Sequence, residues 1–576
     1  MLTKKYIKLF SVLETNQKIR SAYFWFFTII IMFLETFSFG MFYPFLQSIT
    51  NNSLNEEFLS FLNFFSNSLN IDLSVSLIAL LIFTLAIVLK NLFLFFFEFW
   101  SMTFLRDLKL DFKSKVLKAH FQDDYEKISN IKTSVYVRDF NSTIDIFIRS
   151  LQSTMILIIE LSVFIGLVGL LIYIQSKETI FFVIAIGSIS IIFILALKNI
   201  LKSFGGRSLH FDERSLNKLL DILNSTKEIL MSKKSPIFIK QFTKFQFKDL
   251  TIKRTVSMIQ KFPKFFFESM VVVGFTIFIF ILSSKGQDIN KIIPEIGIFF
   301  LAIIRILPAV SKILIYTSKL RYAEAGATKI ANDIRNYKNL FKSKNDLIEV
   351  GFKDSIDLKK ISFNYKNRGK KILDEINLSI SKRDYIGIVG ESGGGKSTLV
   401  DIISGLLKPT GGDIFIDGKK FDNLNTTNWL DKIGYLTQKN NLLDESILTN
   451  ITLEFNKDNI DTKLISEILE KTGLKDLIDN LPEGIDTPVG ENGFAISGGE
   501  KQRIGIARLL YAKKEILIFD ESTSNLDNKN KENIISTINQ LSKEKTIIII
   551  THDESVIKNC KKKYLIKNKK LTTIGL

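Results

Sequence analysis

The sequence predicts an α-helical membrane domain with six spans, followed by an α/β domain that contains a parallel sheet. Six long apolar runs lie before residue 320. After about residue 342 the apolar runs shorten, and strand-like segments alternate with helix-like ones. Apolar runs of about 20 residues are typical of membrane-spanning helices, and alternation of strands with helices is typical of α/β folds.

We expect the membrane domain to cover residues 1–340 and the α/β domain to cover residues 345–576. The six expected spans lie at about 22–46, 73–100, 151–174, 179–197, 265–282 and 292–316. The first apolar run is too long for the hydrophobic core of a cleaved signal peptide, and no small-residue cleavage site follows it. We therefore interpret this run as the first span.

Lysine and arginine are distributed unevenly between these runs. The segment before the first span is basic, the loop 47–72 contains no Lys or Arg, and the segments 101–150 and 198–264 are again basic. The positive-inside rule therefore predicts that both termini and both long loops lie in the cytoplasm. This topology accounts for much of the net charge of +18, so the composition does not require nucleic acid as a partner. The single cysteine, Cys560, excludes an intrachain disulfide.

The two long basic loops carry a helical pattern. Residues 109–128 and 215–231 have apolar side chains at three- and four-residue spacing. We expect the spanning helices to continue into the cytoplasm and to be joined in pairs by a short helix, with tips near 123–131 and 228–235. On the other side of the membrane, residues 54–69 predict an amphipathic helix in the outer interface. This helix either closes the bundle as a lid or touches a lipid substrate.

Six charged residues lie inside or near the ends of the apolar runs: Glu35, Lys90, Glu98, Glu160, Glu268 and Arg305. A charge within the membrane needs a partner or a polar cavity, although Lys90 and Glu98 can extend towards the membrane surface. Arg305 lies mid-span, where exposure to lipid would cost about 2.5–3.5 kcal/mol or more. We expect Arg305 either to contact a substrate or to pair with a carboxylate.

A glycine-rich segment in the second half predicts a phosphate-binding loop. It comprises Gly390, Glu391, Ser392, Gly393, Gly394, Gly395, Lys396, Ser397 and Thr398. The strand-like run 385–389 precedes it and the helix-like run 399–407 follows, which is the context that such a loop requires. The glycines let backbone N–H groups surround phosphate oxygens, and the helix adds its positive end. Lys396 would reach the β- and γ-phosphates of ATP, and Ser397 would hold Mg²⁺.

A second strand-like run, residues 515–519, ends in two acidic residues. Its consecutive apolar side chains suit a strand that is buried on both faces. Asp520 at its end can bind Mg²⁺ through water, and Glu521 can accept a proton from an attacking water molecule. An acidic strand end is common in α/β folds, but the phosphate loop upstream favours the catalytic interpretation.

Between these two motifs, Ser497, Gly498 and Gly499 open an apolar helix that continues to Leu510. Ser497 is suited to cap the helix, and the two glycines expose backbone donors. This helix end predicts a second anion-binding position, but it has no lysine to complete a site alone. A site built from two copies of the chain accounts for it, with ATP between the phosphate loop of one copy and the Ser497 helix of the other.

In this order, these motifs closely resemble an ATP-binding cassette, with Ile496 and Glu500 where the signature usually has Leu and Gln. The resemblance implies that Tyr365 stacks on adenine and that Gln438 senses Mg²⁺ and water. It also implies that 524–527 is the D-loop and that His552 contacts the γ-phosphate. Six spans before one cassette resemble a half-transporter of the exporter type, so the resemblance implies a homodimer with two competent sites.

A narrower resemblance is to the lipid-linked oligosaccharide flippase of bacterial protein glycosylation, the PglK type. It rests on Leu34–Phe37, on the run 298–308 that contains Arg305, and on 391–401. It implies transport of a polyprenyl-diphosphate oligosaccharide across a bacterial inner membrane, with Arg305 as a candidate ligand of the diphosphate. An exporter of lipid A, other lipids, peptides or drugs would share every ATPase residue and remains the alternative. A soluble cassette that acts on nucleic acid is disfavoured by the six expected spans.

Overall fold

The computed structural model describes residues 13–41, 60, 64, 75–173, 177–284, 289–342, 351–365, 369, 371–421, 427–438, 440–490, 496–521, 528–553 and 556–574. The chain divides into two compact units. Unit 1 contains the long helices up to residue 340, except for residues 123–130. Unit 2 contains residues 123–130 together with the chain from residue 341 onwards. The predicted outer helix 54–69 lies outside the described residues, apart from single positions 60 and 64.

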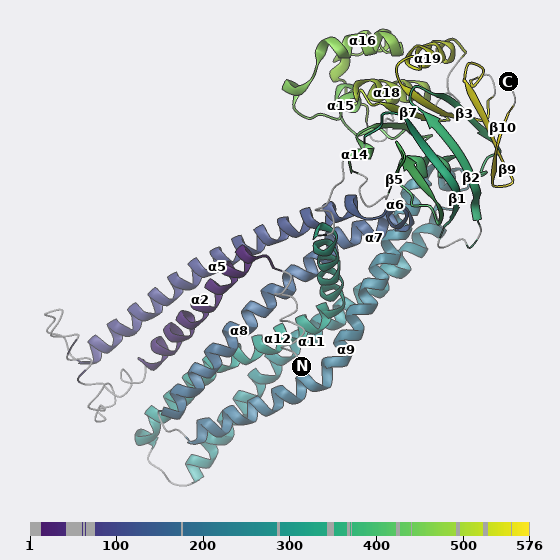
Figure 1. The fold of residues 1–576 in the computed structure, drawn as a ribbon. Helices are drawn as coiled ribbons and strands as arrows, with labels where there is room; N and C mark the ends of the chain where they lie inside the picture. The colour runs from purple at the N-terminus through teal and green to yellow at the C-terminus, as the bar shows by residue number, and fades with distance from the viewer. Residues whose placement is uncertain are drawn as a thin grey trace. The chain divides into compact units, whose positions relative to one another are not determined.

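Six long helices are the main elements of unit 1 (Figure 1). They are α2 (Thr15–Gly40), α5 (Val75–Gln122), α8 (Ile144–Tyr173), α9 (Lys177–Asn224), α11 (Ser235–Ser284) and α12 (Ile289–Lys342). Each predicted span overlaps a different one of these helices, and the end of the first span, residues 42–46, lies outside the described residues. Among the described residues, four helical stretches are long and apolar enough to cross a membrane, namely Thr15–Gly40, Ser76–Gln122, Thr133–Leu170 and Ile186–Asn224. The fifth and sixth spans remain predictions, because many side chains of 275–305 lie outside the described part.

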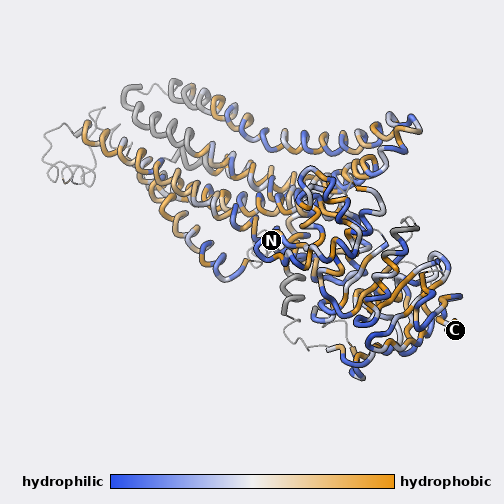
Figure 2. The backbone as a smooth tube through the Cα atoms, turned by 90° about the horizontal axis from the view of Figure 1, so that it is seen from above, coloured by the Kyte–Doolittle hydropathy of each residue, from blue (hydrophilic) through white to orange (hydrophobic). Residues whose placement is uncertain are grey.

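The long helices extend well beyond a membrane thickness. With 48 residues each, α5 and α9 are about 72 Å long, whereas the hydrocarbon core of a bilayer is about 30 Å thick. Figure 2 shows hydrophobic residues concentrated along part of these helices and hydrophilic residues along the rest. Two short helices, α6 (Tyr125–Asn130) and α10 (Thr226–Met231), follow α5 and α9. The predicted helical extensions and the short helices at their tips are therefore confirmed.

Three of the six charged residues expected in or near the spans, Glu35, Lys90 and Glu160, pair with a residue on another helix. Glu35 on α2 is 4% exposed, and the Nζ atom of Lys90 on α5 lies 3.5 Å from its Oε2 atom. Lys90 therefore pairs across helices instead of extending towards the membrane surface, because a buried carboxylate without a partner is costly. Glu160 on α8 likewise lies 2.6 Å from the Nζ atom of Lys312 on α12. The side chain of Arg305 lies outside the described residues, so its environment remains a prediction.

Between α6 and α8 the chain forms α7 (Thr133–Arg138) and a π-helical turn at Asp139–Thr143. Arg138 in α7 is 6% exposed and forms ion pairs with Asp139 and with Glu213 of α9. The other carboxylate oxygen of Asp139 lies 2.5 Å from Nζ of Lys329 on α12. These pairs connect three helices in the polar part of unit 1.

Unit 2 is built on two sheets (Figure 1). The first is antiparallel, in the order β2 (Lys371–Ser381), β1 (Ser355–Asn364), β4 (Gly411–Ile416) and β5 (Lys419–Phe421). The second has the order β10 (Lys570–Thr573), β9 (Lys562–Lys567), β3 (Tyr385–Gly390), β8 (Thr546–Ile550), β7 (Ile516–Asp520) and β6 (Ile433–Leu436). It is parallel except for the β9–β10 pair. The predicted α/β fold with a parallel sheet is confirmed.

Helices cover the parallel sheet and form a separate helical region. β7 and β8 are buried at every position, which accounts for their consecutive apolar residues at 516–519 and 547–550. The helices next to the sheet are α13 (Lys396–Ile403), α14 (Thr427–Leu430) and α19 (Asn528–Leu541). The helical region comprises α15 (Ile447–Thr452), α16 (Thr462–Thr472), α17 (Lys475–Asp479) and α18 (Gly498–Tyr511), with short turns at Lys457–Asn459 and Gly484–Asp486. Ile504 and Ala507 of α18 belong to its apolar core.

Candidate nucleotide-binding site

Four neighbouring parallel strands end at the same edge of the second sheet. In spatial order these are β3, β8, β7 and β6. The phosphate loop follows β3, His552 follows β8, Asp520 and Glu521 end β7, and Gln438 follows β6. Because the carboxyl ends of parallel strands meet at one edge, segments far apart in the sequence come together there.

The glycines of the phosphate loop adopt conformations that other residues avoid. Gly393 has φ of 78° and Gly395 has φ of 98°, both in the left-handed region. A side chain at Gly395 would also meet atoms of Ile372 and Leu373 at 3.0 Å. Lys396 begins α13, and its ammonium group donates to the carbonyl oxygens of Gly390 and Glu391 at 2.8 and 3.0 Å. The loop therefore curves around the lysine and lies at the positive end of α13.

The three residues predicted to be catalytic lie around one carboxylate. Gln438 Nε2 donates to Glu521 Oε2 at 2.6 Å, and His552 Nδ1 lies 3.6 Å from Glu521 Oε1. Glu521 itself has φ of 48°, an uncommon left-handed conformation, and its N–H donates to the Ile550 carbonyl at 2.8 Å. Such backbone strain is concentrated at functional sites in proteins. The arrangement can hold a water molecule or phosphate oxygen between a carboxylate, an amide and an imidazole.

The predicted Mg²⁺ ligands are also neighbours. Asp520 is 5% exposed, and the Ser397 hydroxyl forms a hydrogen bond with its carboxylate. Burial raises the pKa of Asp520 above the ordinary carboxyl value. Hydroxyl and carboxylate oxygens suit Mg²⁺, which keeps water and phosphate oxygens as its other ligands. This limited donor set fits Mg²⁺, and the described residues contain no cluster of three or more His, Cys, Asp or Glu that could hold a metal alone.

Tyr365, predicted to stack on adenine, follows β1 and reaches the helix after the phosphate loop. Its hydroxyl lies 3.2 Å from Thr398 Oγ1, and its ring packs edge-to-face on Phe363 with centroids 4.9 Å apart. The aromatic ring is therefore held next to the loop. The predicted D-loop, 524–527, lies outside the described residues.

Ser497, Gly498 and Gly499 belong to the helical region and not to the strand edge. Ser497 is the N-cap of α18 and is exposed. The Ser497 N–H donates to Glu500 Oε2 at 2.7 Å, and the Glu500 N–H donates to Ser497 Oγ at 3.4 Å. This reciprocal capping box gives a physical role to Glu500, which stands where the signature usually has glutamine.

Two residues of this edge were not predicted. The Tyr435 hydroxyl donates to Asp520 Oδ2 at 3.3 Å. Burial, followed by the negative charge of Asp520, raises the pKa of Asp401 on α13 to about 6. In the sequence, Tyr435 is one aromatic in a strand and Asp401 one acid in a helix. Only an acidic residue five positions after Lys396, on the helix that follows the phosphate loop, could have served as a signal.

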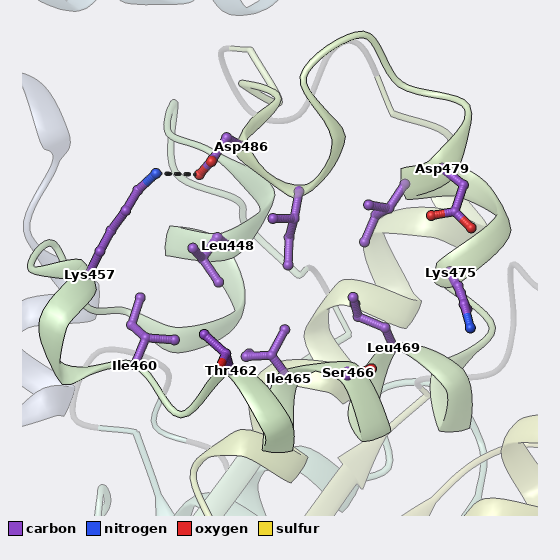
Figure 3. A pocket seen from close by; sticks show the side chains of 12 residues that line it. Leu448, Lys457, Ile460, Thr462, Ile465, Ser466, Leu469, Lys475, Asp479 and Asp486 are labelled. Atoms are coloured by element: carbon purple, nitrogen blue, oxygen red, sulfur yellow. Dashed lines mark hydrogen bonds and ion pairs between the residues drawn. The ribbon is translucent and has the colours of Figure 1, made fainter.

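A pocket of about 450 Å³ lies elsewhere in unit 2, in the helical region (Figure 3). Ile460, Ile465 and Leu469 contribute apolar walls, and an ion pair of 2.9 Å between Lys457 and Asp486 lies at one side. It includes none of the predicted site residues.

A phosphate loop beside a strand-end Asp-Glu pair, on a parallel sheet of this order, defines a P-loop nucleotide-binding domain. Residues 373–524 match the family described as ABC transporter. The alpha-hemolysin translocation ATP-binding protein HlyB of Escherichia coli O157:H7 is 42% identical over 214 residues, which are 37% of this chain and 30% of HlyB.

A putative multidrug export ATP-binding/permease protein of Staphylococcus aureus (strain NCTC 8325) is 38% identical over 220 residues, 38% of each chain. The matches thus span only about a third of these curated relatives. A solved structure of a bacterial Atm1-family ABC exporter with ATP bound is similar over 97% of this chain and 95% of its own, with a TM-score of 0.76 and 17% sequence identity. Residues 373–524 are therefore similar to the ABC transporter family, and the chain as a whole has the fold of an ABC exporter.

Proposed function

We propose that the protein is an ATP-hydrolysing half-transporter of the ABC exporter type. The observation that carries this proposal is the meeting of Gln438, Glu521 and His552 at the edge that also bears the phosphate loop. Residues 1–340 would form the multi-pass membrane domain, and residues 345–576 the cassette. The positive-inside pattern supports a location in a bacterial inner membrane with both termini in the cytoplasm.

In the proposed reaction, Glu521 accepts a proton from the water molecule that attacks the γ-phosphate of ATP. Gln438 and His552, both next to the Glu521 carboxylate, orient this water and the phosphate. Backbone N–H groups of Gly393–Gly395 and the Lys396 ammonium neutralise phosphate charge. Mg²⁺, held by Ser397 and Asp520 with Gln438 nearby, would add further charge stabilisation when bound.

A second copy of the chain is the proposed partner, because Ser497–Gly499 form an anion-binding helix end without a lysine of its own. Mixing two inactive variants tests this. Lys396→Ala removes the phosphate loop of one copy, and Ser497→Arg blocks the helix end of the other. A mixed dimer would retain one site built from the intact loop of one copy and the intact helix of the other. We expect the mixture to hydrolyse ATP although neither variant does alone. Lack of any recovery in verified mixed dimers would contradict a shared site.

The proposed cargo is a lipid-linked oligosaccharide, moved from the cytoplasmic to the outer leaflet. The PglK-type resemblance of the first and sixth spans supports it, as does the guanidinium of Arg305, which suits diphosphate oxygens. The lipid tail of the cargo would stay in the bilayer while its polar head passes through a cavity between two copies of the chain. Export of lipid A, other lipids, peptides or drugs is the second candidate, and the cassette similarity to HlyB and to a multidrug export protein favours it.

Reconstitution into liposomes tests the cargo directly. The purified protein, ATP and labelled lipid-linked oligosaccharide should give ATP-dependent protection of the label from an external glycan-modifying enzyme, and the Glu521→Gln protein should not. Stimulation of ATP hydrolysis by peptides, drugs or lipid A, together with absence of oligosaccharide movement, would favour the second candidate.

A further inference from the structure

The segment that follows β6 is attached to α18 by the side chain of Asn440. The Nδ2 atom of Asn440 donates a hydrogen bond to the backbone carbonyl of Lys501, near the start of α18. In an α-helix such a carbonyl also accepts from the N–H group four residues further on, and its second lone pair is open to a side chain donor. Asn440 lies two residues after Gln438, whose amide donates to Glu521 at 2.6 Å.

A glycine on α18 lets the helix approach this segment closely. A Cβ atom on Gly505 would overlap with Nδ2 of Asn440, and it would lie 2.5 Å from Cδ1 of Leu436, the last residue of β6. Because glycine has no side chain, the buried backbone of α18 at this position lies directly against Asn440 and the end of the strand.

A second set of hydrogen bonds attaches residues further along the segment to the same helix. Nε of Arg508 on α18 donates to the Asn450 carbonyl at 2.8 Å. The Asn450 amide in turn donates to the Leu443 carbonyl at 3.0 Å. Of these two attachments to α18, that of Asn440 lies nearer in the sequence to Gln438.

We propose that Asn440 is a positioning residue for Gln438: by fixing the segment after β6 on α18, it holds the Gln438 amide next to the Glu521 carboxylate. This inference rests on the proposed ATPase function, in which Gln438 orients the attacking water molecule. The Gln438 side chain is exposed, so packing around it does not fix its position, and the backbone that carries it must be held elsewhere.

The loss of this attachment should affect the chemical step more than nucleotide binding. Without the Asn440 hydrogen bond, Gln438 would sample more positions and would orient the attacking water less often. The phosphate loop, which is proposed to bind the nucleotide, takes no part in the contact between Asn440 and α18.

Steady-state ATP hydrolysis by the purified full-length protein tests this. Asn440→Asp keeps the size of the side chain but replaces the N–H donor by an oxygen, which cannot bond to the Lys501 carbonyl. Asn441→Asp is the matched control, because it introduces the same charge one residue further on, at an exposed side chain. We expect Asn440→Asp to lower kcat about three- to tenfold, as befits one lost hydrogen bond, with KM for ATP unchanged within about twofold. The control should change neither constant.

Dependence on Gln438 separates positioning from a general structural effect. In a Gln438→Ala background, Asn440→Asp should cause no further loss of kcat, because no amide remains to be positioned. Unchanged kcat in the single variant, or an equal loss in both backgrounds, would overturn the role of Asn440.

Binding of a fluorescent ATP analogue verifies that each variant is folded. If Asn440→Asp does not bind the analogue, Asn440→Ala and its control Asn441→Ala give the same comparison. Absence of ATP hydrolysis by the wild-type protein would instead contradict the proposed function itself, and this role of Asn440 with it.

Discussion

At the scale of single residues, Glu521 has three features that suit a general base. Its carboxylate accepts from Gln438, lies 3.6 Å from the His552 ring nitrogen, and is directed by a left-handed backbone at the end of β7. A side chain amide in its place would keep the shape and the hydrogen bonding but could not take a proton from water.

We therefore expect Glu521→Gln to lower ATP turnover by at least about a hundredfold while ATP still binds. Phosphate release and retention of labelled ATP are the two measurements. Glu515→Gln is a matched control, because Glu515 directly precedes the same strand and pairs with Lys432 at 2.7 Å, away from the site edge. Normal turnover by Glu521→Gln would remove Glu521 from the proposed role.

Cys560 is a second residue whose chemistry follows from burial. It is 4% exposed, and burial raises the pKa of its thiol to about 12. Thiolate, the reactive form, is therefore scarce at neutral and mildly alkaline pH, and it becomes more abundant only as the pH approaches 12.

At pH 8 we expect a maleimide to label the native protein at least about a hundredfold more slowly than the protein unfolded in denaturant. Because Cys560 is the only cysteine in the chain, mass spectrometry of the intact protein follows the reaction without ambiguity. Rapid labelling of the native protein would mean that the helix and strands around Cys560 open readily.

At the scale of elements, α9 and α12 approach each other closely at Gly205. A Cβ atom at this position would lie 1.9 Å from the Tyr322 carbonyl oxygen. Any residue larger than glycine would therefore push the two helix backbones apart. The next residue, Gly206, has no atom within 4 Å of the corresponding position. Two adjacent glycines on one helix therefore have opposite consequences when they are substituted.

We expect Gly205→Ala to lower the free energy of unfolding by about 1–3 kcal/mol, because the two helices must separate. The control Gly206→Ala should be neutral or stabilising by about 0.5–1 kcal/mol, since alanine favours a helix over glycine. Thermal unfolding of the purified protein in detergent gives both values. Equal melting temperatures for the two variants would rule out a close helix crossing at Gly205.

At the scale of the whole molecule, the proposed function couples ATP hydrolysis to the passage of a polar cargo. We propose that a charge in the sixth span recognises this cargo. Arg305 lies in α12. We expect its guanidinium to bind phosphate oxygens through bidentate hydrogen bonds. A lysine keeps the charge but lacks this planar fork.

Arg305→Ala should abolish movement of lipid-linked oligosaccharide in liposomes and leave basal ATP hydrolysis largely intact, and Arg305→Lys should retain part of the movement. Flipping and ATP turnover are measured on the same preparations. If Arg305→Ala moves the oligosaccharide as fast as the wild-type protein, Arg305 has no part in recognition of the cargo.

Local patterns in the sequence were sufficient to predict most of the elements and several residues that the structure brings together at one edge of the second sheet. The apolar runs predicted the long helices, and the glycine spacing around Lys396 and the Asp520–Glu521 pair predicted the nucleotide edge. These signals are readable because helix length, strand burial and glycine conformation depend on neighbouring residues. Only the tertiary structure decided that Lys90 pairs with Glu35 and that Tyr435 donates to Asp520. Such contacts depend on helix packing and strand order. These bring together residues that are far apart in the sequence, and no local sequence pattern indicates which residue will be the partner.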